Sequence, residues 1–267
     1  MTKNSILDLF KLTDQVAFIT GGGRGIGRAI AVAFAEAGAD IVAVSRTADQ
    51  LAETAKLVQA KGRRCLTVSS DVTDMAQIEA AVDKAMTEFG RIDVLVNNAG
   101  GVHDYFLLEE LTEEEWDKQL NINLKSSFLC SKAVGNVMIK QGRGKIINIS
   151  SVTSFAAFAG IAPYNAAKSA LNNFTKQIAT EWGPKGIWAN AIAPGGVDTH
   201  APEQLRASRK KRGMKIVLME RSNPERPPYE MCIADPAEYA PIALFLASAA
   251  SNHLTGDIIS PGSVALK

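Results

Sequence analysis

The most informative motif of this sequence is Thr20-Gly21-Gly22-Gly23-Arg24-Gly25-Ile26-Gly27. It follows an apolar run, Val16–Ile19, and leads directly into a stretch with helical periodicity, Gly27–Ala37. The run is apolar on both faces, which is typical of a strand buried between helices in a parallel sheet. Because glycine permits tight turns, the chain can pass from strand to helix within a few residues. The sequence therefore predicts a strand, a glycine turn and a helix here.

The same alternation continues along the chain. The predicted strands are Val16–Ile19, Ile41–Val44, Cys65–Val68, Val94–Val96, Lys145–Ile149, Trp188–Ile192 and Asp257–Ser260. The predicted helices are Gly27–Ala37, Gln50–Lys61, Met75–Phe89, Glu113–Lys140, Tyr164–Trp182 and Pro236–Ala247. Such alternation produces right-handed strand–helix–strand units. We expect an α/β fold, a doubly wound parallel sheet of Rossmann type with helices on both faces, as a single domain over residues 1–267.

Composition excludes several classes of function. The chain has 29 Lys+Arg against 28 Asp+Glu, a net charge of +1, which argues against a nucleic-acid or anionic-membrane partner. No apolar run reaches the roughly 18–20 residues of a membrane span. The first residues carry Asp8 and lack the apolar core of a secretory signal. Cys65, Cys130 and Cys232 are far apart, which argues against disulfides and metal sites and favours a cytoplasmic protein.

The glycine turn suits a bound pyrophosphate. The N–H groups and the dipole at a helix N-terminus favour negative charge, and glycine lets the backbone approach it. Gly21, Gly25 and Gly27 follow the pattern T-G-x-x-x-G-x-G, with Arg24 and Ile26 between them. At the first strand–helix turn of an α/β chain, this pattern favours dinucleotide binding over an ordinary turn.

The end of the second strand favours NADP(H) over NAD(H). NAD-binding proteins place an acidic residue there to hold the ribose hydroxyls, but this chain has Ser45 followed by Arg46. A guanidinium such as that of Arg46 can pair with a 2′-phosphate, and we expect Arg24 in the glycine turn to reach the same group. The alternative is that both arginines are solvent-exposed surface charges. After the third strand, Asp71-Val72 could contact the adenine, or Asp71 could cap a helix beginning near Thr73.

A second set of residues carries a family resemblance. Tyr164 and Lys168 are four residues apart, so a helix places them on one face. When this pair is combined with the glycine turn, the sequence resembles the classical short-chain dehydrogenase/reductase family. The resemblance covers nearly the whole chain. The matching residues are Thr20–Gly27, Asn97-Asn98-Ala99-Gly100, Asn123, Ser151, Tyr164, Lys168 and Pro194-Gly195.

The resemblance implies a role for each catalytic residue. Tyr164 is the general acid/base, and Lys168 favours its phenolate and binds the nicotinamide ribose. Ser151 donates a hydrogen bond to the substrate oxygen, and Asn123 holds a water of the proton relay. Taken alone, Tyr164 and Lys168 could instead be an interfacial pair, Ser151 a strand-end cap, and Asn123 a partner of nearby backbone.

The remaining cofactor contacts also follow from the resemblance. Asn98-Ala99-Gly100 would lie against the adenosine ribose, although this tetrapeptide also suits a strand-end turn. The nicotinamide carboxamide site would be shaped by Pro194, Gly195, Val197 and Thr199, which could also form a plain turn. His103 and His200 flank the expected cleft and are interpreted as ordinary polar residues without a metal role.

Residues 199–229 are interpreted as a substrate lid. They combine a basic run, Arg209–Arg212, with an apolar run, Met214–Met219. We expect the lid to close over a fairly large apolar substrate, steroid-like or cyclic, with a basic residue at an anionic tail. Alternatively, the apolar residues pack the lid onto the body or a neighbouring subunit.

The family pairs the helices around Trp116–Lys140 and Tyr164–Trp182 between subunits, so a homo-oligomer, tetramer or dimer, is expected. The C-terminal Ser260-Pro261-Gly262-Ser263 departs from the family's V-D-G-G, and proline removes a backbone donor there.

The predicted function is NADP(H)-dependent interconversion of a small-molecule ketone and a secondary alcohol. The alternatives are an NAD-dependent sugar, polyol or hydroxysteroid dehydrogenase, or a non-catalytic dinucleotide-binding sensor. A sensor would need none of Ser151, Tyr164 and Lys168. The related epimerase/dehydratase group has longer chains than this one.

Overall fold

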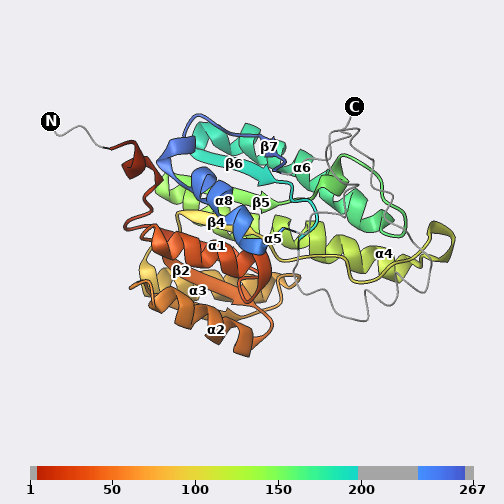
Figure 1. Cartoon of the computed structure of the whole chain (residues 1–267), viewed down its shortest axis with the longest axis horizontal. Helices are drawn as coiled ribbons and strands as arrows, with labels where there is room; N and C mark the ends of the chain where they lie inside the picture. Colours follow the sequence, from red (N-terminus) through yellow and green to blue (C-terminus); the bar gives the residue numbers. More distant parts are fainter. Residues whose placement is uncertain (1–4, 198–233, 262–267) are drawn as a thin grey trace, which may run out of the picture.

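The computed structural model describes residues 5–197 and 234–261. Seven parallel strands form one sheet in the order β3-β2-β1-β4-β5-β6-β7 (Figure 1). The order reverses between β1 and β4, and ligands of such sheets bind beyond the carboxyl ends of the strands at that point. The strands are β1 (Val16–Thr20), β2 (Asp40–Ser45), β3 (Cys65–Ser69), β4 (Val94–Asn97), β5 (Gly144–Ile149), β6 (Ile187–Ile192) and β7 (Ile258–Ile259).

Helices cover both faces of the sheet, as expected for this class. Side chains of β1 alternate between two cores: Ile19 packs on the side of α1, α2 and α8, and Phe18 on the side of α3, α5 and α6. Both residues are fully buried. The helices are α1 (Gly25–Glu36), α2 (Ala48–Gln59), α3 (Met75–Phe89), α4 (Glu113–Leu120), α5 (Ser126–Gln141), α6 (Ala162–Trp182) and α8 (Ala240–Ala247).

The predicted doubly wound fold is confirmed, with differences at particular elements. The helix predicted over Glu113–Lys140 is interrupted by a π-helical turn, Asn121–Lys125, between α4 and α5. The helix predicted from Pro236 begins as a 3-10 turn, Pro236–Tyr239, before α8. π-turns inside helices are rare and frequently mark functional sites.

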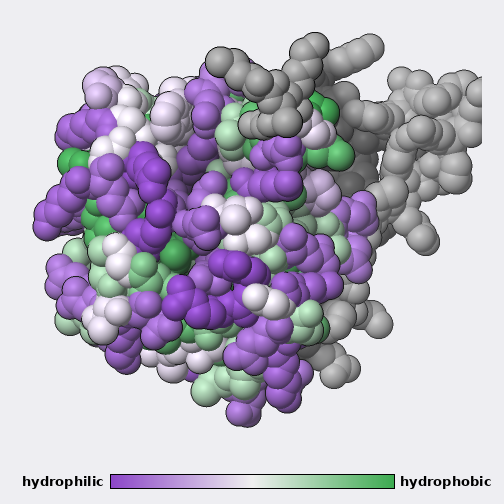
Figure 2. All heavy atoms as spheres, turned by 90° about the vertical axis from the view of Figure 1, so that its left-hand side faces the viewer, coloured by the Kyte–Doolittle hydropathy of each residue, from purple (hydrophilic) through white to green (hydrophobic). Residues whose placement is uncertain are grey.

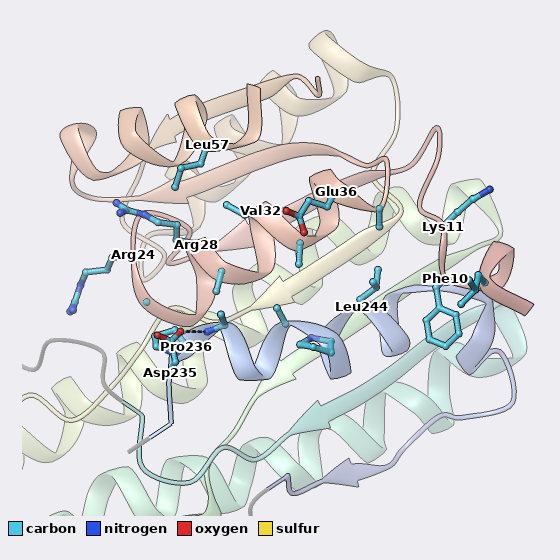
Figure 3. Close-up of a pocket in the computed structure, with 18 residues that line it drawn as sticks. Phe10, Lys11, Arg24, Arg28, Val32, Glu36, Leu57, Asp235, Pro236 and Leu244 are labelled. Atoms are coloured by element: carbon cyan, nitrogen blue, oxygen red, sulfur yellow. Dashed lines mark hydrogen bonds between the residues drawn. The ribbon is translucent and has the colours of Figure 1, made fainter. Parts of the chain in front are cut away.

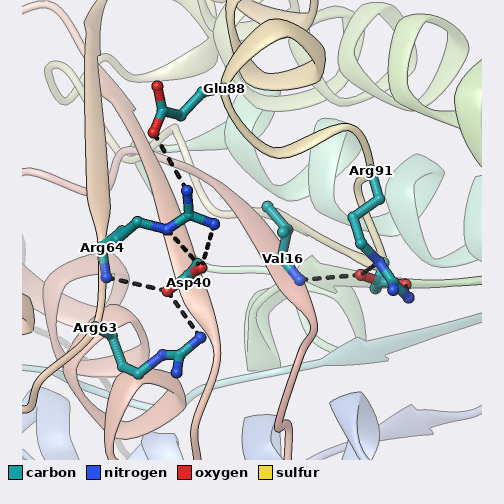
Figure 4. Close-up of polar contacts among 7 residues, drawn as sticks. Val16, Asp40, Arg63, Arg64, Glu88 and Arg91 are labelled. Carbon is teal, nitrogen blue, oxygen red and sulfur yellow. Dashed lines mark hydrogen bonds and ion pairs between the residues drawn. The ribbon is translucent and has the colours of Figure 1, made fainter.

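Carboxylates fix the amino ends of the central strands. Asp93 accepts hydrogen bonds from the backbone N–H of Val16 (2.9 Å) and from Arg91 Nε (2.7 Å), and Asp40 pairs with Arg63 and Arg64 at 2.9 Å each (Figure 4). Figure 2 shows the face at this end of the molecule, whose surface is largely hydrophilic. These charges stabilise the sheet at the end opposite the carboxyl ends of its strands.

Lys145 connects the sheet to the end of α8. Its Nζ donates to the carbonyl oxygen of Ser248 (2.5 Å) and to Ser251 Oγ (2.8 Å), and it lies 5.8 Å from the centre of the Trp188 ring. Ser248 follows the last turn of α8, where a cation stabilises the unpaired carbonyl groups. Burial lowers the pKa of Lys145 to about 8.

The lowered pKa of Lys145 predicts a pH-dependent contribution to stability. Between about pH 8 and pH 10 the unfolded chain still holds the lysine proton that the folded chain has lost, so this residue's contribution rises with pH. We therefore expect the wild type to gain stability relative to Lys145→Met as the pH rises through this range. Urea unfolding of both proteins at several pH values checks this, and a constant difference in free energy would contradict it.

Candidate active site

Glycines shape the turn between β1 and α1. Gly21 and Gly25 have left-handed backbone angles, with φ of 63° and 54°. A Cβ at Gly27 would lie 2.5 Å from Asn98 Nδ2 and closer still to the carbonyl oxygen of Gly21. The residue before α1, Arg24, does not cap the helix with its side chain. The turn therefore presents uncapped helix N–H groups in a space that side chains would fill, which fits the pyrophosphate of a dinucleotide.

Two side chains hold the carbonyl groups of this turn. Thr54 Oγ1 donates to the carbonyl oxygen of Gly22 at 2.9 Å, and the Arg28 guanidinium donates to that of Gly23. Arg28 Nε also donates to Thr54 Oγ1 at 3.1 Å. Neither residue belongs to the predicted site, because their roles depend on a contact between α1 and α2 that no local pattern reveals.

The residues after β4 brace the same turn. Thr20 Oγ1 accepts hydrogen bonds from the backbone N–H groups of Asn98 (3.0 Å) and Ala99 (3.1 Å). Asn98 Nδ2 donates to the carbonyl oxygens of Thr20 (3.0 Å) and Gly21 (3.2 Å). These are the contacts of a strand-end turn, and contact with an adenosine ribose stays a prediction. Gly100, with φ of 147°, allows Asn123 to approach.

Asn123 lies in the π-turn between α4 and α5 and is fully buried. Its Oδ1 accepts from the backbone N–H of Gly101 (2.8 Å), and its Nδ2 donates to the carbonyl oxygens of Gly101 and Gln119, both at 3.0 Å. The side chain thus fixes the loop after β4 to the helix. A role in a proton relay stays a prediction.

The residues predicted to select the cofactor lie together at the ends of β2 and β3. Ser45 Oγ would lie 2.9 Å from a Cβ on Gly23, so it borders the glycine turn. Arg46 is exposed. The hydrogen bond from the N–H of Thr73 is the main cause that lowers the pKa of Asp71, and the charge of Arg46 adds to it. The carbonyl oxygen of Arg46 accepts from Ser69 Oγ at 3.3 Å.

Asp71 forms a turn before α3 rather than its cap. Its Oδ1 accepts from the N–H of Thr73 (2.9 Å) and from Thr73 Oγ1 (2.8 Å), whereas the helix begins at Met75 and is capped by Asp74. The helix thus has the predicted bounds, Met75–Phe89, and the alternative that Asp71 caps a helix beginning near Thr73 is wrong. Val72 is buried beside this turn, and an adenine contact of either residue stays a prediction.

Ser151, Tyr164 and Lys168 meet at the carboxyl end of β5. Ser151 follows this strand, accepts from the N–H of Thr153 at 3.2 Å, and hydrogen-bonds Tyr164. Tyr164 and Lys168 lie in the first turns of α6. Lys168 Nζ is 5.6 Å from the centre of the Tyr164 ring and donates to the carbonyl oxygen of Ile149 at 2.8 Å. The end of β5 and the start of α6 thus bring together three of the four predicted catalytic residues, Ser151, Tyr164 and Lys168.

Burial sets the protonation of this group. It lowers the pKa of the Lys168 ammonium to about 8. Burial also raises the pKa of the Tyr164 phenol, while the hydrogen bond with Ser151 acts in the opposite direction and the nearby Tyr105 raises it further. The phenol therefore holds its proton at neutral pH and can act as a general acid.

The segment that follows β6 is hydrogen-bonded to Val152, the residue after Ser151. The carbonyl oxygen of Pro194 accepts from the N–H of Val152 at 2.9 Å, and the N–H of Gly195 donates to the Tyr239 hydroxyl at 3.2 Å. Val197 pairs with Ala234 in a short parallel bridge. The predicted substrate lid, residues 199–229, lies outside the described residues, as do Thr199 and His200.

A surface groove of about 1000 Å³ runs between α1, α8 and the N-terminal 3-10 helix Ile6–Phe10 (Figure 3). Arg24 and Gly25 line one end of it, and its middle is mostly apolar. Its lining includes none of Ser151, Tyr164 and Lys168, so it is a separate feature. In the described ranges, no cluster of His, Cys, Asp and Glu is arranged to hold a metal ion. None of the described helices is both long and apolar enough to cross a membrane.

Comparison with known proteins covers nearly the whole chain. A family model described as short chain dehydrogenase matches residues 15–210. The 2-dehydro-3-deoxy-D-gluconate 5-dehydrogenase of Dickeya dadantii (strain 3937) is 40% identical over 256 residues, 96% of either chain. A short-chain type dehydrogenase/reductase from Mycobacterium marinum has a TM-score of 0.84 at 32% identity, covering 96% of this chain and 97% of its own.

Carveol dehydrogenase from Mycobacterium avium, in complex with NAD, has a TM-score of 0.83 at 30% identity. It covers 94% of this chain and 96% of its own. The likeness therefore includes a structure that holds a dinucleotide. The protein belongs to the short-chain dehydrogenase family and is an NAD(P)-dependent oxidoreductase that acts on an alcohol or ketone.

Proposed function

We propose that this enzyme uses NADP(H) to interconvert a ketone and a secondary alcohol, with Tyr164 as its acid/base. The observation that carries the proposal is the meeting of Ser151, Tyr164 and Lys168 at the same edge of the sheet as the glycine turn. In a parallel sheet this edge is where cofactor and substrate bind.

Each side chain of the site has a separate role in the proposed reaction. The bound nicotinamide supplies or accepts the hydride. Tyr164 gives its proton to the carbonyl oxygen in reduction and takes one from the alcohol in oxidation. Ser151 donates a hydrogen bond to the same oxygen and stabilises the charge that develops on it. Lys168 donates one N–H to Ile149, and we assign its remaining donors to the nicotinamide ribose.

The preference for NADP(H) rests on charge at the end of β2. Ser45 borders the glycine turn and places no carboxylate there, so a 2′-phosphate meets no repulsion. Arg46 is exposed beside it, and Arg24 projects from the start of α1 (Figure 3). Guanidinium groups recognise phosphate bidentately, which supports the phosphorylated cofactor. The NAD held by carveol dehydrogenase keeps NAD(H) as the second candidate.

We assign the substrate to the hydroxylated sugar acids. The Dickeya relative is named for an acid of this class, oxidised at a secondary carbon, and it matches nearly the whole chain. This class replaces the large apolar substrate as the first choice, because the name of the relative supports it. The residues behind the apolar expectation lie outside the described ranges. A sugar acid also agrees with the idea of a basic residue at an anionic tail.

We also propose a homo-oligomer, tetramer or dimer, formed through α5 and α6. Phe128 on α5 is 45% exposed and packs edge-on against Phe174 of α6, with ring centres 6.2 Å apart. An exposed Phe128 beside a half-buried Phe174 on adjacent helices suits burial against a second copy. The well-separated cysteines support placement in the cytoplasm.

A substrate panel tests the proposed activity. The purified enzyme is assayed with NADP⁺ and 2-dehydro-3-deoxy-D-gluconate, and with cyclohexanol as an apolar cyclic alcohol. We expect reduced cofactor to form with the sugar acid and at least about tenfold more slowly with cyclohexanol, since binding of the remote polar groups helps to orient the reacting carbon. Turnover of the cyclic alcohol alone would overturn the substrate class. Absence of turnover with every alcohol, despite bound cofactor, would overturn the oxidation chemistry.

A further inference from the structure

Asn172 is a buried polar residue one helical turn beyond Lys168, and no role is yet assigned to it. It is 8% exposed and lies on the face of α6 that packs against the end of β5. Its Oδ1 accepts from Ser150 Oγ at 2.6 Å, and its Nδ2 donates to Ser154 Oγ at 2.8 Å. One amide group therefore binds the serines on both sides of Ser151.

The two serines extend these contacts to the backbone around the site. Ser154 Oγ donates to the carbonyl oxygen of Ser151 at 2.5 Å. Ser150 Oγ lies 3.3 Å from the carbonyl oxygen of Lys168, and its single proton goes to the shorter contact with Asn172. A continuous hydrogen-bonded chain thus runs from α6 through Asn172 and Ser154 to the residue that carries the candidate donor.

This chain joins the two elements whose relative placement matters for catalysis. Ser151 lies after β5 and Tyr164 lies on α6, and both must reach the same substrate oxygen. Catalytic groups need to be held to within about 0.5 Å of the productive geometry. A buried amide with both ends paired is costly to displace, because an unpaired buried polar group loses its hydration without replacement.

We propose that Asn172 is a positioning residue that fixes Ser151 against Tyr164 through Ser150 and Ser154. The inference rests on the proposed catalytic roles of Ser151 and Tyr164. The side chain of Asn172 hydrogen-bonds Ser150 and Ser154 rather than Ser151 or Tyr164, so it acts through these two serines.

Tyr164 provides the readout that distinguishes positioning from general support. The groups that face its phenol are Ser151 from the end of β5, Lys168 on α6 and Tyr105 from the loop after β4. The hydrogen bond with Ser151 lowers the pKa of the phenol, so loosening Ser151 raises that pKa. The limb of the pH profile that reports the phenolate in alcohol oxidation then moves to higher pH.

The test compares Asn172→Leu with Asn173→Leu, the same substitution at the exposed neighbouring position. We expect Asn172→Leu to lower kcat at least about tenfold, since small misplacements of catalytic groups cost up to about a hundredfold. The dissociation constant of NADPH should stay within about threefold of wild type, and the phenolate limb should move upward. Asn173→Leu should leave kcat, the cofactor affinity and the limb unchanged.

Ser154→Ala is the second variant, because it removes the hydroxyl that links Asn172 to the carbonyl oxygen of Ser151 and leaves the buried amide in place. It should lower kcat and move the limb in the same direction by a smaller amount. Unchanged kcat and limb in a folded Asn172→Leu or Ser154→Ala would overturn the inference. A fall in kcat, cofactor affinity and melting temperature together, with an unmoved limb, would also overturn it. Failure of the proposed function would look different from failure of the positioning role. In the first case the wild type itself would show no turnover that depends on Tyr164.

Discussion

Tyr164→Phe is expected to lower kcat about a thousandfold while NADPH binds as tightly as before. Phenylalanine keeps the ring that packs 5.6 Å from Lys168 Nζ and removes only the hydroxyl. Proton transfer by a positioned side chain contributes about 10²–10⁴-fold to a rate. Burial keeps the phenol protonated at neutral pH, so this hydroxyl is the acid available next to Ser151.

Steady-state kinetics with the sugar acid and fluorescence titration with NADPH measure the two effects separately. Tyr239→Phe is the matched control, since burial also raises the pKa of Tyr239 and its hydroxyl accepts from Gly195 at 3.2 Å. We expect that control to retain most of its activity. More than about a tenth of wild-type kcat in Tyr164→Phe would assign the proton to another group.

Gly27→Ala is expected to weaken cofactor binding at least about a hundredfold. The added Cβ would lie 2.5 Å from Asn98 Nδ2 and still closer to the carbonyl oxygen of Gly21. This oxygen is a backbone atom of a residue in the left-handed conformation, so it cannot rotate away and the turn must shift to make room. The shift misaligns the helix N–H groups on which the pyrophosphate is expected to rest.

Gly183→Ala is the control for this prediction. A Cβ at Gly183 meets nothing within 4 Å among the described residues, and its φ of −53° suits alanine. We expect it to bind NADPH like the wild type. The dissociation constants and melting temperatures of both variants decide the question. Wild-type affinity in Gly27→Ala would show that the cofactor does not use this turn.

The strands could be predicted from sequence because buried parallel strands are apolar on both faces. The run Val16–Ile19 is one residue short of β1, and the predicted Cys65–Val68 is one short of β3. The meeting of Ser151 with Tyr164 could also be foreseen from the family pattern, and the structure brings the two residues together. The signal for the strands is their apolar composition, and the signal for the two site residues is the resemblance to the family.

Tertiary contacts could not be predicted in the same way. The π-turn that holds Asn123 reads as ordinary helix in the sequence, because its residues keep the helical pattern. The sequence suggests that Asn98 contacts the ribose. It does not reveal that the Asn98 amide hydrogen-bonds the backbone of the glycine turn. The spacing of Asn172 from Lys168 places both on one helix face, but only the fold reveals the serines that it binds.

A titration of both cofactors tests the assignment of the cofactor site. NADPH and NADH are titrated by fluorescence into the wild type and into Arg46→Ala. We predict that NADPH binds at least about tenfold more tightly than NADH, and that the variant loses this preference while binding NADH as before, since a phosphate–guanidinium pair contributes a charge-assisted interaction. Equal or tighter binding of NADH by the wild type would contradict the assignment of Ser45 and Arg46 and make NAD(H) the cofactor.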